Sequence, residues 1–167
     1  MTVTVSHVVF IILSLLALGG GLGVVFSRNL FRAALFLVLS FVGVAGFYIL
    51  LEAELLAMVQ ILVYVGAIAI LIIFAIMLSR RLMSAEVKPW NEQWLGALVA
   101  AVLLGVVLIF VLVSVNWVSI PAEVPGDAIA QLGEALVSPD HFVLPFEVAS
   151  VLLLVALVGA VIIARER

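Results

Sequence analysis

Two hydrogen-bonding side chains lie close together inside a long apolar segment. Gln60 and Tyr64 are four residues apart in the stretch 55–79, which carries no charge. On a helix this spacing places both side chains on one face. A carboxamide and a phenol donate and accept hydrogen bonds without ionising, so the pair is suited to ordering water or to bonding another helix. The rest of that predicted face is small or apolar: Ala57, Ala67, Leu71 and Ala75.

This stripe has two interpretations, and the sequence leaves both open. In the first, small residues let two helices approach and the polar groups bond across the interface. In the second, the Tyr64 hydroxyl lines a hydrated path or a gate. Gly66, two residues further on, faces elsewhere. It lowers helix stability by about 1 kcal/mol relative to alanine, which fits either close packing or local conformational freedom.

Charged side chains are missing from the interior of every long apolar segment. A proton pump or an ion-coupled carrier normally depends on a membrane-embedded charge. The chain is therefore either structural or uses carboxylates that belong to partner proteins. It also has no cysteine, and His7 and His141 lie in distant segments. We therefore expect no catalytic residue, no cofactor site and no metal site in this chain.

Glu147 is an acidic residue near the start of the last apolar segment, shortly after Pro145. Proline and an acid are common in the first turn of a helix, where a missing N–H is harmless and a negative charge meets the positive end of the helix dipole. The alternative interpretation is that Glu147 contacts a neighbouring loop or subunit.

The elements that hold these residues follow from composition. Hydrophobic residues are 68% of the chain and charged residues 10%, which excludes a soluble enzyme, and no basic patch is present for nucleic acid. Five charge-free runs are long enough for helices that cross a bilayer and too long for barrel strands. The sequence thus predicts an all-α integral membrane protein with a single membrane domain over 1–167. Its transmembrane helices are expected at about 7–26, 31–51, 55–79, 94–118 and 144–164, with an outer loop at 119–143 that carries a short surface helix over 126–136.

The distribution of charge predicts the orientation in the membrane, because basic residues concentrate on the cytoplasmic side. All seven follow the first, third or fifth expected helix: Arg28, Arg32, Arg80, Arg81, Lys88, Arg165 and Arg167. The opposite side carries no basic residue and holds seven acids, among them Glu52 and Asp127. The N-terminus is therefore expected outside and the C-terminus in the cytoplasm.

Small residues recur along three of the expected helices, most weakly along the 31–51 helix, which contains Gly43 and Gly46. The 7–26 helix contains Gly19, Gly20, Gly21 and Gly23, and the 94–118 helix contains Ala97, Ala101 and Gly105. Small residues at such spacings let helices approach closely in a bilayer. Their density predicts that the chain packs against more helices than its own five.

Three stretches together resemble the J subunit family of respiratory complex I, called chain 6 in the mitochondrial naming. The segment Gln60-Ile-Leu-Val-Tyr64-Val-Gly66-Ala-Ile, continuing to Met77-Leu, resembles the third transmembrane helix of that family. Arg28-Asn29-Leu-Phe-Arg32 resembles the start of its second helix, and Leu144-Pro145-Phe146-Glu147 the start of its last. The fourth expected helix and the outer loop are generic.

The resemblance implies a non-redox subunit in the membrane arm of a proton-pumping NADH:quinone oxidoreductase, in the lipid bilayer beside the H, A and K type chains and near the quinone. The family's third helix is known for a π-bulge, and its relaxation to regular α-helix is taken to gate a water path. By motif match, Tyr64 and Gly66, with Gln60 before them, would be the coupling or gating residues. NADH, FMN, the iron–sulfur clusters and the quinone would be bound by partner subunits.

Two other assignments stay open. The same stretches resemble the equivalent subunit of the photosynthetic, ferredoxin-driven NDH-type complex, and this chain does not distinguish the two because the electron donor binds another module. A purely structural membrane subunit is the remaining alternative, and it predicts that Tyr64 and Gly66 matter only for stability. The expected location is the bacterial inner (plasma) membrane, as a multi-pass protein.

Overall fold

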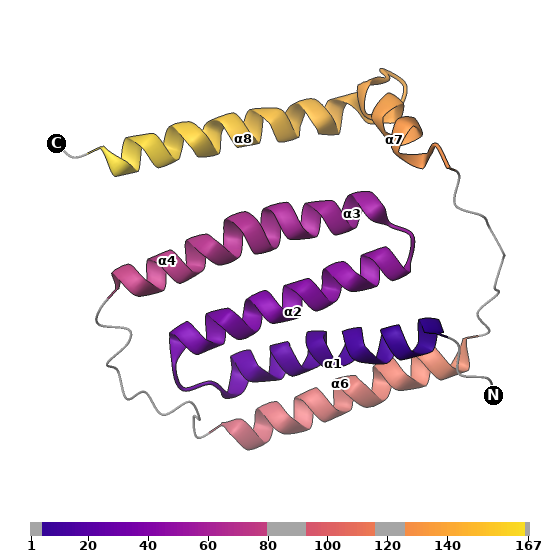
Figure 1. The fold of residues 1–167 in the computed structure, drawn as a ribbon, viewed down its shortest axis with the longest axis vertical. Helices are drawn as coiled ribbons and strands as arrows, with labels where there is room; N and C mark the ends of the chain where they lie inside the picture. The colour runs from indigo at the N-terminus through magenta and orange to yellow at the C-terminus, as the bar shows by residue number, and fades with distance from the viewer. Residues whose placement is uncertain (1–4, 80–92, 116–125, 166–167) are drawn as a thin grey trace. The chain divides into compact units, whose positions relative to one another are not determined.

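The regular structure of the chain is helical throughout the parts that the computed structural model describes, residues 5–79, 93–115 and 126–165 (Figure 1). The elements are α1 (Val5–Phe26), α2 (Leu30–Leu50), α3 (Glu54–Val59), the π-helix η1 (Gln60–Ala69), α4 (Ile70–Leu78), α6 (Trp94–Ser114), α7 (Ala128–Val137) and α8 (Val143–Ala164). Because α3, η1 and α4 follow one another without a break, they form one long helix, called the third helix below.

Five helices in the described ranges are long and apolar enough to cross a bilayer: α1, α2, the third helix, α6 and α8. They have 21 to 25 residues, which at about 1.5 Å per residue matches a hydrocarbon core of about 30 Å. The all-α class with five candidate transmembrane helices is thus confirmed. Most bounds lie within two residues of the expected ones. The exception is α6, which ends at Ser114 where 118 was expected, and residues 116–125 lie outside the described part.

The chain divides into two compact units, Met1–Ile120 and Pro121–Arg167. In the first unit, α2 packs along both α1 and the third helix, and Figure 1 shows α2 between them. In the second unit, α7 packs against α8. The segment of the third helix that holds its polar residues therefore packs along α2.

The helices α1 and α2 pack so closely that a side chain on some of their glycines would clash with the backbone of the facing helix. A Cβ atom on Gly20 would lie 2.6 Å from the backbone nitrogen of Ser40, and one on Gly43 would lie 2.7 Å from that of Ala17. The Ser40 hydroxyl donates a hydrogen bond of 2.9 Å to the Ala17 carbonyl oxygen. By contrast, a Cβ on Gly19 would meet no atom within 4 Å. Close packing therefore explains Gly20 and Gly43 but not Gly19.

The small residues of α6 have no such role within the described chain. A Cβ on Gly105 would meet no atom within 4 Å. No residue of α6 is buried. The ribbon formed by Ala97, Ala101 and Gly105 therefore has no such contact within its own compact unit, as expected for a surface that packs against a further helix.

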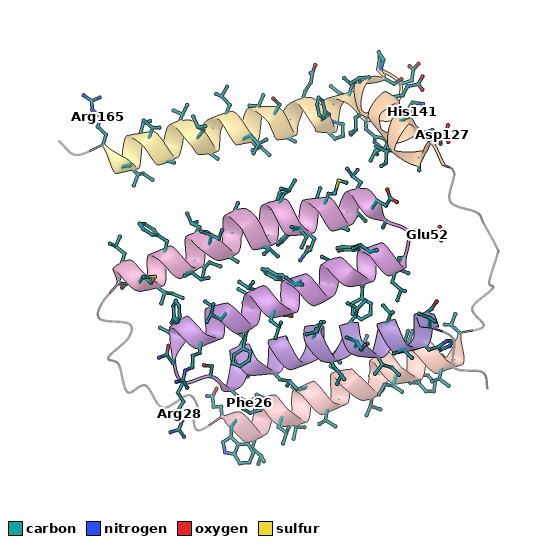
Figure 2. All side chains as sticks on the ribbon, in the orientation of Figure 1. Phe26, Arg28, Glu52, Asp127, His141 and Arg165 are labelled. Atoms are coloured by element: carbon teal, nitrogen blue, oxygen red, sulfur yellow. The ribbon has the colours of Figure 1, made fainter. Side chains whose placement is uncertain are left out.

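A short turn after α1 orients the start of α2. The side-chain oxygen of Asn29 accepts hydrogen bonds from the N–H groups of Phe31 at 2.9 Å and Arg32 at 3.3 Å. Asn29 is thus a side-chain cap, which satisfies two of the N–H groups left free at a helix start. The turn also holds Arg28, which lies at this end of α2 (Figure 2).

The turn between α2 and the third helix places acidic residues at the opposite end of α2. Glu52 adopts a left-handed backbone conformation with φ of 58°. Its N–H donates to the Ile49 carbonyl oxygen at 3.0 Å, and the Ala53 N–H donates to that of Tyr48 at 2.8 Å, which is the pattern of a Schellman cap. Glu54 then begins α3 but makes no side-chain cap. Figure 2 shows Arg28 and Glu52 at the two ends of α2.

Candidate functional site

The π-helix η1 contains the three residues singled out in the third helix, Gln60, Tyr64 and Gly66. In a π-helix each N–H donates a hydrogen bond to the carbonyl oxygen five residues earlier. Such segments are rare in proteins, and those that occur often lie at functional sites. The segment here covers ten residues, which is longer than the single-turn bulge implied by the resemblance. The flanking residues Val59 and Ile70 have α-helical torsions, so the helix passes from α to π and back without a break.

Gly66 lies inside η1, and no other helix of its compact unit lies close to its Cβ position. A Cβ at this position would have one atom within 4 Å, the carbonyl oxygen of Ile61 at 3.3 Å. Ile61 is five residues earlier, so its carbonyl is the bonding position for Gly66 in a π-helix. The absent side chain therefore relieves crowding within the π turn itself, and packing between the described helices of this unit does not explain the glycine.

Gln60 is a buried polar residue at the start of η1. Only 7% of its surface is exposed, yet among the described residues no hydrogen bond reaches its carboxamide. Among the described residues, every fully buried side-chain nitrogen or oxygen has a hydrogen-bond partner. The amide atoms of Gln60 are therefore not fully buried and keep some exposed surface. Because an unbonded amide in an apolar medium is costly, water or a group from another chain is the expected partner.

Tyr64 lies beside an aromatic ring of α2. Its ring meets that of Phe41 edge to face, with centroids 5.6 Å apart and an interplanar angle of 77°, a favourable arrangement for two aromatic rings. The side chain is 43% exposed, and its hydroxyl makes no hydrogen bond within the described part of the chain. Phe41 thus orients the ring and leaves the hydroxyl free for water or a partner. Phe41 was not singled out from the sequence, because no pattern indicates which ring of α2 meets Tyr64.

Beyond Tyr64, the less exposed residues of the third helix are not those of the predicted stripe. Ala57 and Gln60, which belong to that stripe, are buried. Ala67, Leu71 and Ala75 are exposed, and the less exposed positions between Tyr64 and the end of α4 are Val65, Ala69, Ile72, Ile73 and Ile76. The prediction assumed α-helical spacing throughout. Because each π turn takes an additional residue, the face that meets α2 moves one or two positions toward the C-terminus.

Glu147 lies one turn inside α8, in the second compact unit, and its side chain is exposed. It makes no hydrogen bond or ion pair within the described residues. The described residues also contain no group of three His, Cys, Asp or Glu side chains that could hold a metal ion.

These features define a class of protein. The chain is a multi-pass membrane protein with a polar π-helical segment, and the hydrogen-bonding groups of this segment are not satisfied by the described chain itself. Its apolar helices carry no charged residue deep in a span. Such a chain is expected to work next to other membrane proteins.

Comparison with known proteins identifies the family. The model of the family described as NADH-ubiquinone/plastoquinone oxidoreductase chain 6 matches residues 20–163. This chain belongs to that family, and the resemblance found from three short stretches is confirmed over most of the sequence.

Individual relatives agree with the family assignment. The NAD(P)H-quinone oxidoreductase chain 6 of Synechocystis sp. is 37% identical, over 97% of this chain and 82% of its own length. The chloroplastic subunit 6 of the same enzyme from Anthoceros angustus is 38% identical, over 96% and 84%. The F(420)H(2) dehydrogenase subunit J of Methanosarcina mazei is 39% identical, over 94% and 89%.

Proposed function

We propose that this chain is a non-redox subunit in the membrane arm of a proton-pumping, complex I-type quinone oxidoreductase. Membership in the chain 6 family is the observation that carries the proposal. The structure supports it through surfaces that require partners, since α6 and α8 bury none of the residues in their most apolar windows. The enzyme activity belongs to the complex, and this chain contributes no catalytic centre.

Cofactors are assigned to the partner subunits in this proposal. The sequence has no cysteine to ligate an iron–sulfur cluster. NADH or another donor, FMN, the clusters and the quinone would then be held by other chains, with the H, A and K type chains as the membrane neighbours. Glu147 is proposed as a contact with one of these subunits, because its exposed carboxylate has no partner among the described residues.

The sequence of this chain does not indicate which electron donor the complex uses. Relatives of similar identity are named for NAD(P)H in cyanobacteria and chloroplasts and for F(420)H(2) in an archaeon. Both an NADH-driven complex and the photosynthetic, ferredoxin-driven type are therefore compatible with it. We propose a bacterial plasma membrane as the location.

We further propose that the third helix couples quinone reduction to proton movement by changing between π and α geometry in η1. In the π form, the less exposed residues of the third helix beyond Tyr64 include Ala69, Ile72 and Ile76. In a regular α-helix the same face would present Ala67, Leu71 and Ala75. The conversion therefore rotates α4 relative to α2 and exchanges one set of side chains for the other.

This exchange changes the space available beside α2. The α form would place Ala75 near the level where the π form has Ile76, so a branched side chain is replaced by a methyl group. Water entering that space would find Gln60 and Tyr64, whose polar groups make no hydrogen bonds within the described chain. The proposed gate thus opens and closes a hydrated path without any charge on this chain.

Fusions of a reporter protein test the orientation. Fusions after Arg32, Arg81 and Arg167 are expected on the cytoplasmic side, and fusions near Glu54 and Asp127 on the outer side, because all basic residues follow alternate helices. Figure 2 shows the same separation within each unit, with Arg28 opposite Glu52 and Arg165 opposite Asp127. Arg80, Arg81, Lys88 and Arg167 lie outside the described residues. An outer-side signal from the Arg81 fusion would overturn the orientation.

Copurification tests membership in the complex. The tagged chain, extracted from its own membranes with a mild detergent, is expected to bring down the hydrophilic redox subunits and the other membrane chains of a quinone oxidoreductase. The preparation should oxidise a nicotinamide or related donor with quinone as acceptor. A tagged unrelated multi-pass protein from the same membranes serves as the control. Recovery of the chain alone, or with no redox subunit, would contradict the proposal.

A further inference from the structure

The short helix α7 separates apolar and polar side chains onto opposite faces. Ile129, Leu132 and Leu136 recur at spacings of three and four residues, which places them on one side of the helix. The opposite side carries Asp127, Gln131 and Glu134, and the Gln131 side-chain nitrogen donates to the Asp127 carboxylate at 2.9 Å. The apolar side is only partly covered, since Ile129 is 53% and Leu132 41% exposed.

The chain fixes α7 at the end of a membrane-length helix. Five residues separate Val137 from Val143, where α8 begins. Within this link the Phe142 N–H donates to the Ala135 carbonyl oxygen at 3.0 Å, and the His141 N–H donates to that of Ser138 at 3.2 Å. These bonds hold α7 against the first turn of α8 (Figure 1). If α8 crosses the bilayer, α7 lies at the boundary between hydrocarbon and water.

The start of α8, against which α7 packs, also carries exposed apolar side chains. Phe142, Leu144 and Phe146 are 54%, 70% and 48% exposed, and the window of α8 that follows has no buried residue. A bilayer covers such a surface as one continuous layer. Attraction to anionic headgroups plays no part, because residues 89–164 contain no Lys or Arg.

We propose that α7 lies in the plane of the membrane surface and binds phospholipid, with Ile129 and Leu132 among the upper parts of the acyl chains. Its acidic face points to water. Amphipathic helices of this kind bind through the apolar area that they bury. Because α7 lacks the basic residues that usually add electrostatic attraction, it should bind zwitterionic lipid as well as anionic lipid. This inference does not depend on the function proposed above or on the side of the membrane.

A photocrosslinking residue at position 129 tests the proposal in the full chain within its own membranes. Ile129→p-benzoylphenylalanine is expected to give phospholipid adducts, whereas the matched control Gln131→p-benzoylphenylalanine gives none. Transfer of the preparation into phosphatidylcholine nanodiscs should leave the adduct yield at position 129 within about twofold. The readout is the mass of the crosslinked chain.

Two outcomes at position 129 would overturn the proposal. A protein adduct means that a partner subunit covers this face, and no adduct means that the face is in water. If the Ile129 variant does not accumulate, the Leu132 position on the same face gives the same test. A third arm uses the absence of native cysteine: in the nanodiscs, where both membrane faces are open to the reagent, a membrane-impermeant maleimide should label Gln131→Cys at least tenfold faster than Leu132→Cys. Equal labelling would also count against the lipid contact.

Discussion

Gly66→Leu is expected to reduce proton pumping per quinone reduced while the complex still assembles. The new side chain would crowd the Ile61 carbonyl, which already lies 3.3 Å from the Cβ position. Loss of glycine also favours regular α-helix by roughly 1 kcal/mol, which alone shifts a π–α balance about fivefold. With crowding added, we expect pumping to fall by more than fivefold. The measurement is donor-driven quinone reduction and proton uptake in membrane vesicles, normalised to assembled complex.

Gly159→Leu is the matched control for this experiment. Gly159 lies in α8, where a Cβ would meet no atom within 4 Å of the described chain, so the same change is made in a regular helix of the same chain. Gly66→Ala should have a smaller effect in the same direction and is the variant to use if Gly66→Leu prevents assembly. Normal pumping per complex in both Gly66 variants would refute gating and support a purely structural role.

Tyr64→Phe is expected to be milder in the same assay. The variant keeps the ring and therefore its contact with Phe41. Only the hydroxyl is lost, and a hydrogen bond in a membrane protein contributes roughly 1 kcal/mol, so the rate should change several-fold. A larger loss than in Gly66→Leu would place the coupling function in the hydroxyl and not in the helix geometry.

Gly20→Val is expected to prevent accumulation of the complex, whereas Gly19→Val should be tolerated. The Gly20 Cβ position lies 2.6 Å from the Ser40 nitrogen and 2.9 Å from the Phe36 carbonyl oxygen. Both atoms are backbone, so α1 and α2 must separate and the hydrogen bond from Ser40 to Ala17 must break. Overpacking of this kind costs about 1–3 kcal/mol, up to roughly a hundredfold in the packing equilibrium.

Gly19→Val is a close control for Gly20→Val, because the two glycines are adjacent in one helix. Both variants lose glycine and gain the same β-branched side chain, so effects on helix propensity and membrane insertion are shared. The difference between them reports the contact with α2. The measurement is the amount of complex on a native gel, relative to total chain. Equal amounts in the two variants would mean that the close approach of α1 and α2 does not support assembly.

The helices could be predicted from the sequence because length and the absence of charge decide which segments cross a bilayer. The short turns could be placed for the same reason, since Arg28 and Glu52 interrupt the apolar runs. Residues 60–66 could also be singled out, because polar groups are rare in such segments. These inferences use local composition only, which the sequence displays directly.

The face of the third helix could not be predicted beyond Tyr64. An apolar segment looks the same for α and π geometry, so no periodicity revealed that Ala69 and Ile72 would replace Ala67 and Leu71. The contact of Tyr64 with Phe41 depends on how two helices meet, which composition does not contain. Gly19 and Gly20 cannot be told apart in the sequence, because they differ only in the residues that lie opposite them in the folded chain.

The uneven burial of the helices has a consequence for biogenesis. The helices α1, α2 and the third helix contact one another, so this part can form as soon as it is inserted. In the most apolar windows of α6 and α8 no residue is buried, and lipid offers these small-residue surfaces no specific contact. Under the proposed function, the partner subunits complete the packing of α6 and α8 in a newly made chain. Its lifetime, and thus its cellular amount, would then be set by the supply of those subunits and by the proteases that remove orphan chains.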